Sequence, residues 1–219
     1  MIAEMRMLLW KDFRLSRLCI LAGIIFTIIP YLLLIFPYFF SYFTDYRFET
    51  AWVASAFVSQ LAMAFIAGNI IACERADRSA AFLAYQGASR KMIVTSKMLF
   101  CTIVLVSICA ISFILSFWIK LKPYEIKEVL KFQIFIAAIG FCFLGGAWLL
   151  SNLFPSPVPA IVFGILSPIC IFYGLSMTAF YFHWPVDSTI QYWYTAFNIT
   201  AGLISLVAGT WHFIRSKES

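Results

Sequence analysis

The stretch ERADRSAAFLAYQGASRKMIVTSK, residues 74–97, is a charged segment in a chain that is otherwise mostly hydrocarbon. Its five Lys and Arg residues outnumber its two acidic residues and leave a net charge of +3. Charge at this density is too costly to remain unpaired in the core of a bilayer. The segment is therefore expected to lie in water or against a partner protein.

The local pattern in this segment predicts two helices joined by a sharp turn. Residues 79–85 are rich in Ala and Leu, which favour helix, and Phe82 and Leu83 give this short helix an apolar surface. Gly87 is a natural helix stop, and Ser89 is a good cap for the next helix. We expect a short helix with exposed apolar side chains, followed by a helix that enters the membrane.

The order of charged and apolar residues here resembles the cytoplasmic loop of type-2 ABC transporter permeases. In that family the loop joins the second and third spans and contains the coupling helix, which docks on the ATP-hydrolysing subunit. The resemblance implies contact with the ATPase for Glu74, Arg75, Asp77, Arg78, Phe82, Leu83, Gly87, Ser89, Arg90 and Lys97. The family's turn usually contains a proline, where this chain has Gly87 and Ala88. The alternative interpretation is an ordinary solvated loop between two spans.

Composition places the whole chain in the membrane class. Hydrophobic residues make up 63%, aromatic residues 19% and charged residues only 12%, with a mean hydropathy of +0.92. The net charge of +6 comes from basic clusters beside apolar runs, where such residues set topology and contact anionic headgroups. This distribution argues against nucleic acid as a partner. The six cysteines lie in or beside apolar runs without close pairs, which argues against a disulfide or a metal site.

Six uncharged runs are long enough to cross a bilayer, for which about 20 apolar residues suffice. The predicted spans cover residues 18–43, 51–73, 98–119, 132–154, 160–182 and 192–214, with the coupling loop 74–97 between the second and third. The predicted fold class is an all-α membrane protein with six transmembrane helices in a single domain, 1–219. Ala64 and Gly68 in the second span form a small-xxx-small pair suited to close helix packing. The resembled family has short re-entrant helices before its last span, and residues 183–194 are the candidates here.

Residues 1–17 predict an amphipathic helix that lies on the membrane. At helical spacing, its apolar positions Ile2, Met5, Leu9 and Phe13 lie largely opposite Glu4, Lys11 and Arg14. In the resembled family such an interfacial helix lies on the cytoplasmic side and also touches the ATPase. That role would fall to Trp10, Lys11 and Arg14. The alternative is a positively charged flank that only orients the first span.

The distribution of Lys and Arg predicts the topology. With six spans and both termini in the cytoplasm, 11 of the 16 basic residues lie on the cytoplasmic side. The positive-inside rule therefore favours a multi-pass protein of the plasma (inner) membrane with cytoplasmic N and C termini.

The chain lacks the motifs of a motor or an enzyme. It has no phosphate-binding G-x-x-x-x-G-K-[ST], no G-x-S-x-G and no H-E-x-x-H, and no predicted span contains a charged residue. We therefore expect no enzymatic activity, no cofactor and no metal in this chain, with ATP and Mg bound by a separate subunit. The resemblance implies a homo- or heterodimer of permease subunits with ABC ATP-binding subunits, and export as the direction.

Two other classes of function stay open. An intramembrane enzyme of unrecognised type would need polar residues of different spans, such as Gln60, Asn69, Ser107 and Ser112, to converge. A non-catalytic scaffold or sensor would use the loop 74–97 to recruit a soluble partner. The identity of a transported substrate is not encoded in any recognisable motif.

Overall fold

The chain folds into long helices. The computed structural model describes residues 2–35, 47–76, 89–119, 126–154, 156–181 and 188–215, and within these ranges there is no strand. The helices are α1 (Ile2–Ile35), α2 (Arg47–Ala76), α4 (Arg90–Ile119), α5 (Ile126–Leu153), α6 (Pro157–Tyr181) and α7 (Ser188–Arg215). Each helix overlaps one predicted span, which confirms the all-α fold class.

Five stretches of described residues are long and apolar enough to cross a membrane. They are Glu4–Pro30, Arg90–Leu115, Leu130–Leu153, Pro157–Tyr181 and Gln191–Arg215. In α2, a shorter apolar stretch covers Gln60–Ala72. These helices support a multi-pass membrane protein, whereas the layout with six spans stays a prediction.

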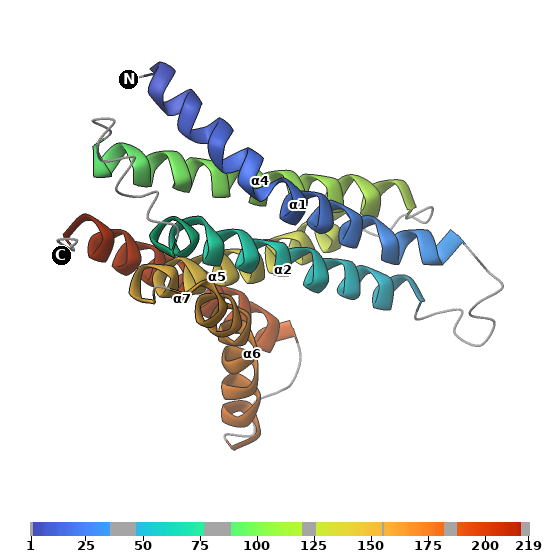
Figure 1. The fold of residues 1–219 in the computed structure, drawn as a ribbon. Helices are drawn as coiled ribbons and strands as arrows, with labels where there is room; N and C mark the ends of the chain where they lie inside the picture. The colour runs from blue at the N-terminus through green and yellow to red at the C-terminus, as the bar shows by residue number, and fades with distance from the viewer. Residues whose placement is uncertain are drawn as a thin grey trace.

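The helices form one bundle (Figure 1). α1 packs against α2 and α4, while α5 packs against α2, α6 and α7. In Figure 1, α6 runs steeply across the direction of α1 and α2. The N terminus, the C terminus, the end of α2 and the start of α4 all lie toward the same end of the bundle. The segment 77–88, outside the described residues, therefore leaves and re-enters the fold at the end that holds both termini.

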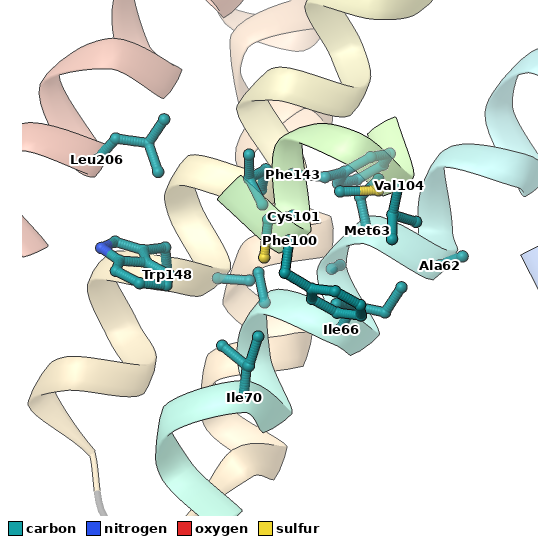
Figure 2. Packing of buried hydrophobic residues seen from close by; sticks show 14 of the residues in the cluster. Ala62, Met63, Ile66, Ile70, Phe100, Cys101, Val104, Phe143, Trp148 and Leu206 are labelled. Carbon is teal, nitrogen blue, oxygen red and sulfur yellow. The ribbon is translucent and has the colours of Figure 1, made fainter. Parts of the chain in front are cut away.

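The core lies among α2, α4, α5 and α7. Figure 2 shows Met63, Ile66, Phe143 and Trp148 gathered there, and all four side chains are at most 1% exposed. Close helix contacts depend on glycine: a Cβ placed on Gly68 would lie 2.6 Å from a side-chain carbon of Ile161 in α6. This contact confirms the close-packing role for Gly68 of the small-xxx-small pair.

The N-terminal segment is not a separate helix. α1 continues without a break from Ile2 through 34 residues, because no glycine or proline interrupts its first five turns. Its buried face consists of Leu8, Asp12 and Ser16, whereas Trp10 and Phe13 are exposed and stack with ring centroids 5.9 Å apart. Asp12, which the amphipathic pattern did not assign to either face, lies on the buried face, while the exposed Phe13 remains available to a membrane surface. The position of its first turns on a membrane stays a prediction.

The segment before the last span also differs from the expectation. Ser188 to Tyr194 belong to the continuous helix α7 and form no short helix of their own, while residues 183–187 lie outside the described residues. Tyr194 points inward, is 4% exposed and donates a hydrogen bond to the carbonyl of Pro168 at 3.0 Å. The prediction of separate re-entrant helices is wrong for 188–194, because nothing in this sequence breaks the helix and an inward tyrosine anchors it to α6.

Candidate functional site

The site is built around a buried lysine. Lys97 in α4 is 2% exposed, and its ammonium group donates to Glu74 Oε1 at 2.9 Å, to the carbonyl oxygen of Ile70 at 2.9 Å and to Asp12 Oδ1 at 3.3 Å. A lysine ammonium has three hydrogens and accepts nothing. Each hydrogen of Lys97 therefore has an acceptor, contributed by α1 or α2.

Lys11 completes a balanced group of charges. Its ammonium group pairs with Glu74, and its side chain is 32% exposed, whereas Asp12 and Glu74 are 2% and 7% exposed. We call Lys11, Asp12, Glu74 and Lys97 the charge cluster. Removing charges from water costs several kcal/mol per ion, which only close pairing offsets. The cluster satisfies this condition because its two basic and two acidic residues balance formally.

The charge cluster lies at the base of the predicted coupling loop. Glu74 lies near the end of α2 at Ala76, and Lys97 lies two turns into α4, so the segment 77–88 connects the two elements that the cluster ties together. Asp12 and Lys11 bring in the N-terminal part of α1. At the same end a small apolar contact joins Leu8 of α1, Ile93 of α4 and Phe213 of α7. The three helices are thus held together at the end of the bundle where α2 ends and α4 begins.

Ser89 begins α4 as predicted. Its hydroxyl accepts a hydrogen bond from the backbone N–H of Met92 at 3.2 Å, and its carbonyl accepts from the N–H of Ile93 at 3.1 Å. This is the geometry of an N-cap, which satisfies a free N–H at the start of a helix. The predicted helix start after the turn is confirmed.

The structure divides the predicted contact residues into two groups. Glu74 and Lys97 are buried in the charge cluster, so in this arrangement they are not surface contacts in water. Ser89 and Arg90 are exposed, as are Trp10 and Arg14 on the outer face of α1. Outside the described residues lie the Arg75 side chain and Asp77, Arg78, Phe82, Leu83 and Gly87. Contact of any of these residues with an ATPase stays a prediction.

Sequence reasoning missed Asp12. It was read as part of an interfacial helix, but its carboxylate faces Lys97 across the bundle. A signal was present, because Asp12 is the only acidic residue between Glu4 and Asp45 and lies at helical spacing from Leu8 and Ser16. Its pairing partner could not be read from the chain, since 85 positions separate Asp12 from Lys97.

Of the polar residues that an intramembrane enzyme would need, Ser107 does not join the buried ones. Gln60 is fully buried, with its amide nitrogen 3.9 Å from Cys109 Sγ, and Ser112 is buried 3.5 Å from the amide of Gln133. Ser107 instead is exposed on α4, where its hydroxyl donates to the carbonyl of Ile103 in the same helix. Within the described residues, no group of three or more His, Cys, Asp or Glu side chains could hold a metal ion.

Comparison of the chain with family models, curated proteins and solved structures gave no match. The functional interpretation therefore depends on the residues and on the geometry of the charge cluster.

Proposed function

We propose that this chain is the permease subunit of an ATP-driven transporter of the type-2 ABC class. It would form the translocation path as a dimer of such subunits, work as an exporter and receive its energy from a separate ATP-binding subunit. The predicted coupling loop 74–97 would dock on that subunit.

The observation that carries this proposal is the charge cluster at the base of the loop. A loop that transmits force to membrane helices needs a stiff base, since a freely hinged loop would move without them. Here Lys97 of α4 is tied to Glu74 of α2 and to Asp12 of α1. Breaking such a buried pair leaves an uncompensated charge and costs about 3–5 kcal/mol, so the three helix ends are expected to move as one unit.

The mechanism follows from this coupling. ATP-driven closure of two ATP-binding subunits would displace the loop of each permease subunit. Because the charge cluster joins the ends of α2 and α4 to α1, the displacement would tilt these three helices together. Rigid-body movement of packed helices about an interface is a common form of such transitions. The path would then open toward the opposite side of the membrane.

Reconstitution tests the proposal. The purified chain in proteoliposomes is expected to show no ATP hydrolysis, because it has no phosphate-binding motif. Adding its cognate P-loop ATPase should yield a stable complex and ATP-dependent transport. A chain that forms no complex with any P-loop ATPase co-expressed from its own source would contradict the proposal and favour a scaffold or sensor.

A further inference from the structure

An open groove runs between α1 and α2 on the outside of the bundle and encloses about 300 Å³. It is lined by Leu18, Cys19, Ala22 and Phe26 of α1 and by Leu61, Ala62 and Phe65 of α2. The small side chains of Ala22 and Ala62 leave the space, while Phe26 and Phe65, 46% and 42% exposed, border it. This volume lies at the lower end of the range for clefts that bind small molecules. Since every lining side chain is apolar, the groove suits a hydrocarbon chain.

On α1, the wall of the groove continues toward the N terminus as two basic residues, Lys11 and Arg14. Residues three and four apart share a face of a helix. One such stripe along α1 consists of Lys11, Arg14, Leu18 and Ala22. Arg14 is exposed, and among the described residues no ion pair involves it. The ammonium group of Lys11 donates one hydrogen bond to Glu74. Because the Lys11 side chain is 32% exposed, its other two hydrogens can bind a second acceptor.

The dimensions of this stripe match one leaflet of a bilayer. From Leu18 to Phe26 the helix rises about 12 Å. Half of the hydrocarbon core of a bilayer is about 15 Å thick. The predicted first span begins at residue 18, so Arg14, one turn earlier, lies at the level expected for lipid headgroups.

We propose that the groove and the basic pair Lys11 and Arg14 bind one anionic phospholipid of the bilayer. One acyl chain lies between Ala22 and Ala62, and the phosphate receives hydrogen bonds from Arg14 and Lys11. Arginine binds phosphate with two parallel charge-assisted hydrogen bonds, which supplies specificity as well as affinity.

Charge complementarity favours this occupant over a second copy of the chain. A protein surface that covered the groove would also approach Arg14 and would have to supply an acidic residue, because an unpaired charge is costly to bury. A phospholipid supplies the hydrocarbon and the negative charge in one molecule. The site also adjoins the charge cluster through Lys11, which would share its hydrogens between Glu74 and the phosphate. The inference depends only on membrane insertion and not on the proposed transport function.

Photocrosslinking tests the site directly. Phosphatidylglycerol with a diazirine in the middle of one acyl chain is added to the delipidated full-length protein in detergent. Phosphatidylcholine with the same chains serves as the comparison. Mass spectrometry of the digested protein then shows which peptides carry lipid. We expect phosphatidylglycerol to label residues 18–26 and 61–65 at concentrations at least about fivefold lower than phosphatidylcholine, because each basic residue beside an anionic headgroup contributes about 1 kcal/mol.

Two variants and two controls complete the experiment. Arg14→Gln should weaken phosphatidylglycerol labelling of the groove about fivefold, and Ala22→Leu should abolish it by filling the space. Lys131→Gln, an exposed basic residue of α5, and Ala208→Leu, an exposed position of α7, should label as wild type. Equal labelling by the two lipids, or unchanged labelling of Arg14→Gln, would overturn the proposal. Disulfide crosslinking of two protein copies through Ala22→Cys in a cysteine-free background, in place of lipid labelling, would also overturn it.

Discussion

The ammonium group of Lys97 lies 2.9 Å from Glu74 Oε1, so an ion pair inside the bundle joins the two ends of the predicted coupling loop. Glu74 lies at the end of α2 and Lys97 near the start of α4, with the loop between them. Their pairing fixes the distance between the points where the chain leaves and re-enters the bundle. A force on the loop would therefore act on both helices, and through Asp12 also on α1.

Replacing Lys97 with methionine should destabilise the protein strongly. Methionine keeps the length of the side chain but leaves Asp12 buried without its cationic partner. Breaking one side of a buried ion pair costs about 3–5 kcal/mol. For a chain of this size, the Tm in detergent is expected to fall by roughly 6–20 °C. Differential scanning fluorimetry of the purified protein measures this shift.

A double variant separates lost pairing from a general packing defect. Asp12→Asn combined with Lys97→Met removes both charges, so its loss of stability should be smaller than the sum of the two single losses by at least about 1 kcal/mol. Lys91→Met, an exposed site on the same helix, should stay within about 0.5 kcal/mol of wild type. If the stability losses of the two single variants add up to the loss of the double variant, Asp12 and Lys97 do not stabilise each other.

The close contact at Gly202 of α7 and the open space at Gly174 of α6 predict opposite effects of substitution. A Cβ placed on Gly202 would lie 2.8 Å from the backbone oxygen of Phe141, whereas nothing lies within 4 Å of a Cβ placed on Gly174. Gly202→Ala should therefore destabilise the fold by about 1–3 kcal/mol through overpacking. Gly174→Ala should be neutral or stabilise by up to about 1 kcal/mol, because alanine favours helix. Equal Tm values for the two variants would mean that the helices are not in close contact at Gly202.

A further prediction concerns the topology in the membrane. Single cysteines placed at Ser79 and Ser219 in a cysteine-free background should be protected from an impermeant maleimide in intact cells and become reactive after permeabilisation. A cysteine at Lys122 should react in intact cells. The reason is the excess of Lys and Arg in the segments assigned to the cytoplasm. Labelling of Ser79 in intact cells would reverse the assignment.

Features of the fold that depend on local composition could be predicted from the sequence. Long uncharged runs predicted membrane-spanning helices, and helices are found at all six positions. Ser89 as a cap and Gly68 as a point of close packing also follow from local chemistry, and both are confirmed.

What the sequence could not supply are contacts between distant residues. The carboxylate of Asp12 pairs with Lys97 of α4, and hydrophobic periodicity within α1 could not indicate this partner. The groove that Ala22 and Ala62 leave open depends on how α1 and α2 lie against each other. From the sequence, Tyr194 was assigned to the re-entrant segment 183–194. Its actual partner, the carbonyl of Pro168, lies 26 positions away.

The proposed coupling surface can be tested by substitution in the loop. Phe82→Ala with Leu83→Ala removes apolar area of the kind worth about 1.5–3 kcal/mol per large side chain when buried. Arg78→Glu places a like charge one turn from Glu74 and removes a cation that could pair across the interface. Neither change touches a predicted span, so the protein should still insert in the membrane. A substitution at Lys127, in the predicted outer loop, is the control.

Co-purification of the P-loop ATPase with these variants is the most direct measurement of the proposed function. The tagged permease is isolated from membranes that also contain the ATPase, and the amount of bound ATPase per permease is determined. We predict that the Phe82→Ala/Leu83→Ala and Arg78→Glu variants retain much less ATPase than wild type, while the Lys127 variant retains the wild-type amount. Wild-type retention by both loop variants would contradict the account, because it would show that residues 74–97 are not the coupling element.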